Sequence, residues 1–538
     1  MKPLLLATVV CASAVVTLPA DGRKFYDDDP LWRVEDTQDA SKARSWEISL
    51  TYDSIASLVG VPENPPSVHA GDVNSVDEVP DSSWFTNRQV RSADDMMRGV
   101  DDDKGPAPGK WTVRRKGNGV SPGFQATDSR GSRYFVKFDP PGWSELASGA
   151  ENVVTRLYYA LGYYLPQTNI AYVRREDLVI APDATIDTAS GKKRRMRESD
   201  IDDNLRRSAR LPDGRYRCLV SEALPGTPLG GYKYIGTRPD DPNDVIEHED
   251  RRSLRALRVF GAWVNHVDAK AINSFDTLIS EGGRSYVRHN LLDFGSTFGS
   301  AGIGTRDRRD SYEYVVEMPP TRRALPAFGF APRKWMHIEY PDYRRIGRFE
   351  SASFVPDEWK PRFPNPAFNY ARPDDLFWAA HRLMTTMTDD LIRAAVRAGQ
   401  YSDPQTVEAL NRILIERRDK IARAWLPIVN PVVDVALTEG GLSFRNAAVQ
   451  FGVSPAPASY TIVWSRFNNE SGTATRIAET TGGEQMAAPA GLPSSQGSYV
   501  QVDIRATEAS IASWRVPVHT WFRRTAEGWK LVGLERLP

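Results

Sequence analysis

The chain contains few cysteines, no excess of charge of either sign and no long apolar run beyond its first residues. Among 538 residues only Cys11 and Cys218 are cysteines, which excludes a disulfide-rich framework and a Cys-rich zinc site. The 69 Lys and Arg residues balance 69 Asp and Glu residues, so no overall field attracts nucleic acid or anionic lipid. No later segment approaches the ~18 consecutive apolar residues of a membrane span. We therefore expect no nucleic-acid partner and no transmembrane segment after signal removal.

Spacing patterns for several other enzyme classes are also missing. The seven histidines show neither an H-E-x-x-H pattern nor a Cys/His metal-ligand spacing, which argues against a zinc enzyme. No G-x-S-x-G string occurs, and Cys218 lies within an apolar stretch, so a hydrolase with a Ser or Cys nucleophile is not supported. No repeat of about 20–50 residues is present, which excludes solenoids and propellers.

The first residues have the pattern of a secretory signal peptide. A basic head, Met1-Lys2, precedes an apolar stretch from residue 3 to 16 that is too short to cross a bilayer. We predict a signal peptide at residues 1–20 and export to the periplasm, the envelope or the medium, although cleavage within 12–14 is an alternative. Lipoprotein anchoring through Cys11 is less favoured, because bulky valine precedes it where lipidation requires a small residue.

The next ninety or so residues, 21–110, are rich in Asp, Pro, Ser and Asn. Their large apolar residues, Trp32, Trp46, Trp84 and Phe85, are too widely spaced to form a core of their own. This composition predicts an extended N-terminal arm whose aromatic residues dock on the domain that follows.

Beyond the arm, hydrophobic periodicity indicates strands first, helices later and strands again. A hairpin is expected from Phe124 to Val136, and an amphipathic helix with Val153, Leu157 and Leu161 on one face ends near Gly162. Helices are expected to begin near residues 373, 388 and 403, and alternating strands follow residue 430. We predict an α+β protein with a strand-rich unit at 111–225, a helical unit at 226–428 and an all-β sandwich at 429–538.

Two short strings carry the chemical signal. The first is His266-Val-Asp-Ala-Lys-Ala-Ile-Asn273, and the second is Leu291-Leu-Asp-Phe-Gly295, which follows a predicted strand. Together they resemble the catalytic and metal-binding loops of the protein-kinase-like superfamily, including its HipA-type and phosphatidylinositol-kinase-like variants. The resemblance implies that the strand-rich and helical units are the two lobes of a kinase-like domain.

The resemblance also implies a reaction that uses ATP and Mg²⁺. In such a site Asp268 receives the proton of the acceptor hydroxyl, and Lys270 contacts the moving phosphoryl group. Asn273 and Asp293 supply the oxygen ligands that Mg²⁺ prefers. The acceptor is an unknown protein or small molecule.

Upstream residues complete the nucleotide site that the resemblance implies. Lys137, in the string Tyr-Phe-Val-Lys-Phe, is the expected strand lysine that holds the phosphates, and Glu151 is its expected partner, with Glu145 as the alternative. Gly117 and Gly119 stand where a phosphate-covering loop belongs, although their spacing departs from G-x-G-x-x-G. Residues 221–224 are expected at the edge that meets the adenine.

Some features of the sequence favour structural interpretations over catalytic ones. Val267 replaces the arginine that commonly precedes the catalytic aspartate, so control by a phosphorylated loop is not expected. Asp268 and Asn273, taken singly, could cap a helix and a turn. Lys137 could be an exposed surface charge, and His266 is expected to be structural. The alternative function is therefore a pseudokinase-like binding or adhesion module of the cell envelope, in which the fold is a scaffold.

Overall fold

The protein is a mixed α+β structure with several sheets. The computed structural model describes residues 22–49, 62, 65–100, 105–117, 121–188, 192–316 and 332–536. The predicted signal peptide at 1–20, including Cys11, lies outside the described residues, as does Gly119. Among the described residues, none of the helices combines the length and apolar composition that a bilayer span requires.

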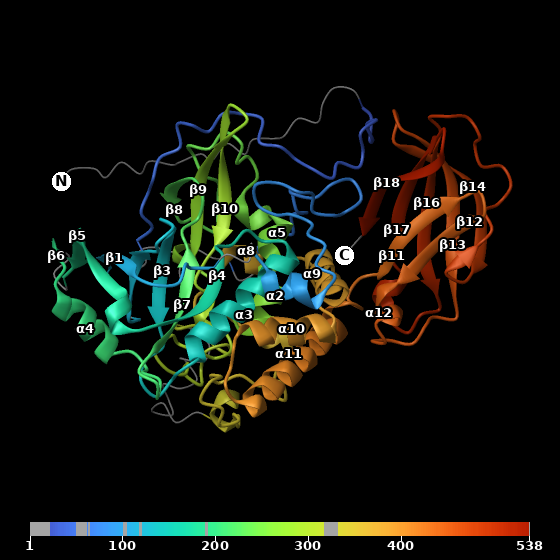
Figure 1. Cartoon of the computed structure of the whole chain (residues 1–538). Helices are drawn as coiled ribbons and strands as arrows, with labels where there is room; N and C mark the ends of the chain where they lie inside the picture. The colour runs from blue at the N-terminus through green and yellow to red at the C-terminus, as the bar shows by residue number, and fades with distance from the viewer. Residues whose placement is uncertain are drawn as a thin grey trace, which may run out of the picture.

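A seven-stranded sheet lies at one end of the molecule (Figure 1). Its order is β4-β7-β3-β2-β1-β5-β6, and all neighbours are antiparallel except β1 and β5. The strands are β1 (Trp111–Lys116), β2 (Gly123–Thr127), β3 (Arg133–Phe138), β4 (Thr168–Val173), β5 (Leu178–Asp187), β6 (Lys193–Arg195) and β7 (Tyr216–Glu222). Strands β2 and β3 confirm the predicted hairpin and pair Gly123 with Lys137. Helix α4 (Glu198–Arg206) lies beside this sheet.

Helix α3 (Leu146–Leu161) connects this sheet to the helical part of the molecule. Its predicted apolar positions, Val153, Leu157 and Leu161, are fully buried. Gly162 ends the helix with a φ of 119°, which favours glycine, and its N–H bonds the carbonyl of Tyr158. The predicted helix and its end are thus confirmed.

The central part combines a small sheet with most of the helices. The sheet has the order β10-β9-β8, from β8 (Thr227–Gly230), β9 (Ser274–Glu281) and β10 (Arg284–Leu291). The helices are α5 (Arg252–Arg255), α6 (Leu257–Val264), α8 (Pro366–Asn369), α9 (Pro373–Thr386), α10 (Asp389–Ala398) and α11 (Pro404–Trp425). Thr388 and Asp403 cap α10 and α11 through their side chains, which confirms the predicted starts.

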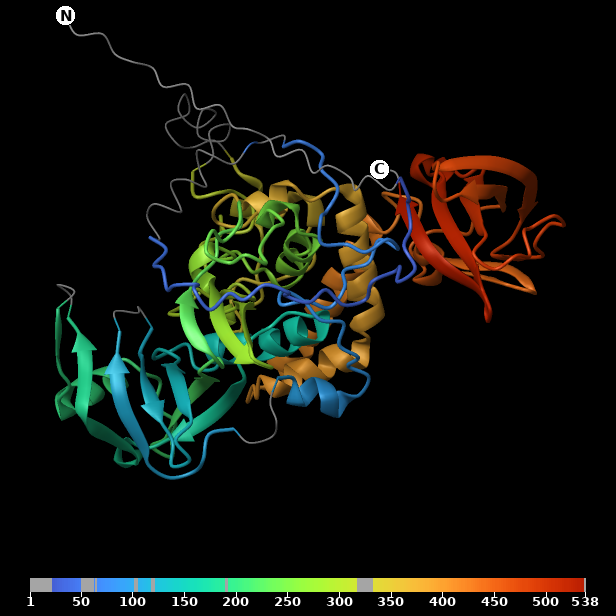
Figure 2. The same cartoon turned by 90° about the horizontal axis from the view of Figure 1, so that it is seen from above.

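The arm crosses the surface from the C-terminal strands towards β8–β10 (Figure 2). Helix α2 (Ala93–Arg98) lies near its end. Trp84 and Phe85 are buried as expected, and Trp46 Nε1 donates a hydrogen bond to the carbonyl of Gly231. The expectation that Trp32 anchors the arm is wrong, since this side chain is 56% exposed.

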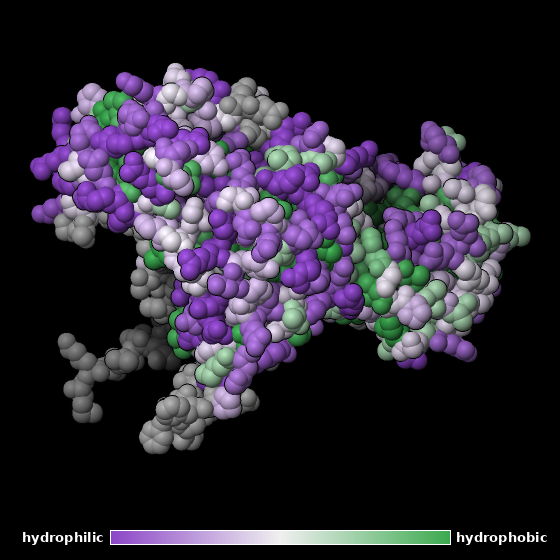
Figure 3. All heavy atoms as spheres, turned by 60° about the horizontal axis from the view of Figure 1, so that its bottom comes forward, coloured by the Kyte–Doolittle hydropathy of each residue, from purple (hydrophilic) through white to green (hydrophobic). Residues whose placement is uncertain are grey.

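The C-terminal part contains two antiparallel sheets at the end opposite the seven-stranded sheet (Figure 1). They have the orders β11-β12-β15 and β14-β13-β16-β17-β18. The elements are β11 (Val432–Thr438), β12 (Gly441–Asn446), α12 (Ala447–Gln450), β13 (Ser459–Asn468), β14 (Thr473–Gly482), β15 (Gln485–Met486), β16 (Tyr499–Thr507), β17 (Val518–Thr525) and β18 (Gly528–Arg536). On the face shown in Figure 3, hydrophilic residues predominate over the body, and hydrophobic residues gather on the C-terminal part where it adjoins the body.

Candidate active site

Three side chains from three separate elements form a chain of ion pairs. Lys137 Nζ, on β3, lies 3.0 Å from Glu151 Oε2 on α3 and 2.8 Å from Asp293 Oδ1, just after β10. Glu151 is buried and Asp293 is half-exposed. The ion pair with buried Glu151 therefore orients the ammonium group of Lys137, which also meets the carboxylate of Asp293 from a segment far along the chain.

The string from His266 to Asn273 forms a compact loop after α6. Asn265 ends α6 in the left-handed region with a φ of 56°. Asp268 Oδ1 lies 2.9 Å from Lys270 Nζ, and Asn273 Nδ2 donates a hydrogen bond of 2.8 Å to the carbonyl of Asp268. The loop therefore folds back on itself and brings its carboxylate, ammonium and amide groups together.

The loop is tied directly to the segment that carries Asp293. The N–H of Leu292 donates a hydrogen bond of 2.9 Å to the carbonyl of Asn273. Asp293 itself adopts a φ of 62° and a ψ of 61°, and the next residue, Phe294, is buried against His266 and Tyr158. Asn273 and Asp293 are therefore neighbours in space, although twenty residues separate them in the sequence.

A cavity of about 350 Å³ opens between the seven-stranded sheet and this loop. Lys137, Glu151, Asn273 and Asp293 line its polar end, and residues 221–224, the expected adenine edge, also line it. Apolar or partly apolar side chains from both sides make up much of the remainder, including Ala126, Phe135, Ile272, Phe275 and Leu292. Asp268 and Lys270 are not among the lining residues and lie beside the polar end.

The charges at the site shift the pKa values of its members. Burial opposes the charged form of Lys137, but the carboxylates of Asp293 and Glu151 outweigh it and raise the pKa of this lysine. Lys137 in turn is the main cause that lowers the pKa of Asp293. Burial also opposes ionisation of Asp268, yet Lys270 and Arg306 keep its pKa below the ordinary value. Both aspartates are therefore carboxylates at neutral pH.

The donor set fits a hard divalent cation. Asp293 offers a carboxylate, of which Lys137 contacts one oxygen, and the amide nitrogen of Asn273 is engaged by Asp268, so its oxygen remains for a cation. Asn273 and Asp293 would hold Mg²⁺, and Lys137 would contact the phosphates that this ion accompanies.

Other expected residues lie apart from this group. Gly117 is exposed just after β1, and its nearest side-chain neighbour is Asp187 rather than Lys137. Glu145, the alternative partner, pairs with Arg345 at 2.9 Å and accepts a hydrogen bond from the N–H of Ser402. The geometry therefore selects Glu151 over Glu145 as the partner of Lys137.

His266 sits in a packed, buried position. Its ring lies 5.3 Å from that of Phe294, and burial lowers its pKa to about 4. It packs against Phe294, the residue that follows Asp293, in the structural role that we expected from the sequence.

Arg306 is a site residue that the sequence did not reveal. Its Nη2 lies 3.5 Å from Asp268 Oδ2, and its Nε donates a hydrogen bond of 2.9 Å to the carbonyl of Ser300. Arg306 is buried, and it also approaches Asp310 at 3.9 Å. It follows Asp268 by 38 positions, in a segment without regular spacing, so no local sequence signal pointed to it.

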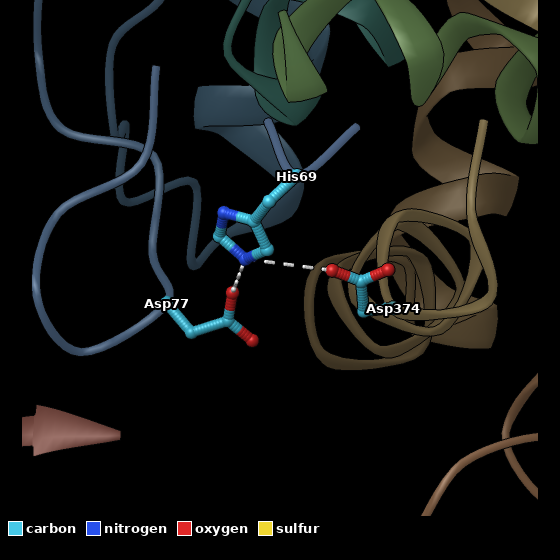
Figure 4. Close-up of side chains that lie close together, drawn as sticks. All are labelled: His69, Asp77 and Asp374. Atoms are coloured by element: carbon cyan, nitrogen blue, oxygen red, sulfur yellow. Dashed lines mark ion pairs between the residues drawn. The ribbon is translucent and has the colours of Figure 1, made fainter. Parts of the chain in front are cut away.

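A second cluster, His69, Asp77 and Asp374, has the side-chain types of a metal site (Figure 4). His69 Nε2 lies 3.6 Å from a carboxylate oxygen of each aspartate. Arg252, fully buried, bonds both carboxylates, at 2.6 Å to Asp77 and 3.0 Å to Asp374. Because the guanidinium already supplies the positive charge that a cation would bring, we interpret this cluster as an ion-pair network joining the arm to α9.

Comparisons with known proteins add little evidence about the function of this site. No protein-family model matches the chain, and no curated protein matches it either. Among solved structures it is similar to the crystal structure of the Golgi casein kinase, with 13% sequence identity and a TM-score of 0.30. The match covers 73% of this chain and 94% of that one. At this TM-score the likeness bears on no residue of the site.

Proposed function

We propose that the protein is an ATP- and Mg²⁺-dependent phosphotransferase that moves a phosphoryl group to a hydroxyl of a protein or small molecule. The observation that carries this proposal is the contact of Lys137 with both Glu151 and Asp293 at the polar end of a cavity that Asn273 also lines. In this proposal residues 111–225 and 226–428 are the two lobes of a kinase-like domain. The arm and a C-terminal β-sandwich at 429–538 flank it in an exported protein.

The cavity suits a nucleoside triphosphate in both size and polarity. Phe135 and Ile272, each nearly half exposed, present apolar surface from opposite lobes where a flat base would lie. The polar end lies at Lys137 and Asp293, where the phosphates would reach. Bound Mg²⁺ would neutralise phosphate charge, and Glu151 would keep Lys137 oriented towards the phosphates.

In this proposal Asp268, which lies beside that polar end, takes part in proton transfer. Its carboxylate is held by Lys270 and Arg306, and its lowered pKa keeps it ionised at neutral pH. An ionised carboxylate can orient the acceptor hydroxyl and accept its proton as the new oxygen–phosphorus bond forms, while the bond from the γ-phosphorus to the β-phosphate oxygen breaks and ADP leaves. Lys270 then lies where it can balance the charge of the moving phosphoryl group.

Binding can be tested by thermal unfolding of the full chain with and without ATP and MgCl₂. We expect ATP with Mg²⁺ to raise the Tm of the wild type and of Asp390→Asn, a matched control at an exposed position of α10. Asp293→Asn should lose this shift, because it removes the charged oxygen ligand. Ligand at about 100 times Kd stabilises by about 2.7 kcal/mol, which is well within detection.

Chemistry can be tested separately from binding. With ATP labelled in the γ-phosphate, the wild type should release or transfer the label, and Asp268→Asn should do so about 10²- to 10⁴-fold more slowly. The nucleotide-induced shift in Tm should remain in Asp268→Asn. If no chain shows a shift in Tm, the proposed function is wrong; a shift without any turnover in the wild type would favour the pseudokinase-like binding module.

A further inference from the structure

The five-stranded C-terminal sheet holds one aromatic side chain of the arm in a closely fitting pocket. Phe25 is 3% exposed, although its neighbours Lys24 and Tyr26 are exposed. Its ring centroid lies 5.6 Å from that of Trp521 and 6.1–6.2 Å from two further rings, those of Phe467 and Tyr499. Gly533 leaves the space for this ring, since a Cβ there would lie only 2.4 Å from Phe25 Cζ.

The side chain of Asn469 binds both backbone polar groups of Phe25. Asn469 Oδ1 accepts the N–H of Phe25 at 2.8 Å, and Asn469 Nδ2 donates to the carbonyl of Phe25 at 2.8 Å. The N–H of Lys24 bonds the backbone carbonyl of Asn469 at 3.0 Å. Paired contacts of this kind hold an extended backbone whatever its side chains, as in other peptide-binding sites.

Charged side chains recognise the positions on either side of Phe25. Lys24 Nζ lies 3.6 Å from the centre of a Trp521 ring and 3.5 Å from Glu535. On the other side, Arg523 bonds both the carboxylate of Asp27, at 3.0 Å, and its carbonyl, at 2.7 Å. The sheet therefore recognises four successive positions: a basic residue, an aromatic residue, any residue and an acidic residue.

The arm fills only part of the available space. An open cavity of about 960 Å³ continues along the sheet from Phe25 and is lined by Tyr499, Leu492 and residues 466–470. Further along the arm, Tyr26, Leu31, Trp32 and Val34 expose 40–56% of their surface, a density of exposed apolar side chains typical of interaction segments. These apolar side chains are therefore left largely uncovered by the sheet that buries Phe25.

We propose that this face of the C-terminal sheet is a binding site for extended peptides with the pattern Lys/Arg–aromatic–x–Asp/Glu. Residues 24–29 of the arm are its intramolecular ligand, and a partner segment of the same chemistry displaces them. A tethered ligand competes at an effective concentration in the millimolar range, so the intact arm keeps weak ligands out. The site is independent of the proposed phosphotransfer reaction.

The test is a fluorescence-anisotropy titration of a labelled synthetic peptide of residues 22–30 with the full chain. The Phe25→Ala chain should bind this peptide at least tenfold more tightly than the wild type, because its arm no longer fills the pocket. A peptide with alanine in place of phenylalanine should not bind. Equal binding of the peptide by the two chains, or of the two peptides by Phe25→Ala, would overturn the proposal.

A second pair of variants separates loss of the pocket from loss of the fold. In the Phe25→Ala background, Gly533→Ala should abolish peptide binding, because its Cβ occupies the position of the ring. Gly483→Ala, which meets nothing within 4 Å, should leave binding unchanged. Sedimentation should show a monomeric wild type; a dimer that dissociates when the peptide is added would place the arm of a second copy in the site and overturn the intramolecular assignment.

Discussion

Lys137 illustrates how much a single residue depends on its partners. A lysine on a strand is usually an exposed surface charge, yet here Glu151 and Asp293 both contact its ammonium group. Their attraction raises the pKa of Lys137, so the residue stays positive across any working pH. Asp293 belongs to one of the two short strings, whereas Lys137 and Glu151 were named as upstream residues that the resemblance implies, with Glu145 left open as the alternative to Glu151.

Separate substitutions of Glu151 and Glu145 test which of the two glutamates orients Lys137. Glu151→Gln removes the buried carboxylate that orients Lys137. We expect the rate of phosphotransfer to fall about 10- to 100-fold, which is the loss typical when a residue that orients a functional group is removed. Glu145→Gln breaks a pair with Arg345, away from the cavity, and should retain transfer. Steady-state transfer rates of the two variants are the measurement. A larger loss in Glu145→Gln would show that the wrong glutamate has been assigned.

His69 gives a pH dependence with a definite sign. The nearby carboxylate of Asp77, 3.6 Å from Nε2, is the main cause that raises the pKa of His69 in the folded protein. Folding therefore favours its protonation, and the stabilisation is full below the unfolded pKa of about 6.5 and lost as pH rises through the folded value. Because His69 is nearly half exposed, the effect should stay below about 1 kcal/mol.

The measurement is the difference in unfolding free energy between the wild type and His69→Gln at pH 5.5 and at pH 8.5. We expect the wild type to be the more stable of the two at pH 5.5, with little or no difference at pH 8.5. A difference that is the same at both pH values would mean that the charge of His69 contributes nothing. The same comparison with a His337→Gln variant controls for a surface histidine whose ring contacts no carboxylate in the described ion pairs.

At the scale of elements, local patterns correctly predicted several strands and helices. The β2–β3 hairpin, α3 and the capped starts of α10 and α11 are set by turn residues, apolar periodicity and capping side chains, all within a few positions. The loop at 266–273 was found in another way, through the resemblance of its string to a known motif, and its catalytic role stays a prediction. Arg306 and the docking of Phe25 were not predictable, because each depends on the path of the chain between distant elements.

Gly162, at the end of α3, lies against Phe85 of the arm and provides a test of the packing between the two. Its φ of 119° is strained for any other residue, and a Cβ there would lie 2.5 Å from the Phe85 ring of the arm. Gly162→Ala should therefore destabilise the protein by about 1–3 kcal/mol from the backbone alone. Urea unfolding is the measurement, and Gly483→Ala, which has open space, is the control. Equal stability of the two variants would contradict the tight contact between α3 and the arm.

The whole molecule brings the site together from segments that are far apart in the sequence. Strand β3, α3, the loop after α6 and the segment after β10 all contribute side chains, and the loop contributes the most. The arm crosses between the central part and the C-terminal sheets, so it links regions that the sequence presented as successive units (Figure 2). The sequence indicated the units from their periodicity and correctly named Trp46, Trp84 and Phe85 as docking residues of the arm, but it was wrong for Trp32, which is exposed.

The central claim concerns one metal-bound nucleotide, and a crystal structure of the chain with Mn²⁺ and a non-hydrolysable ATP analogue tests it most directly. An anomalous peak for Mn²⁺ should lie about 2.0–2.6 Å from oxygens of Asn273 and Asp293, the range for hard cations. The phosphates should reach Lys137 and the base should lie between Phe135 and Ile272. A metal bound elsewhere, or an empty cavity at saturating ligand, would contradict the account.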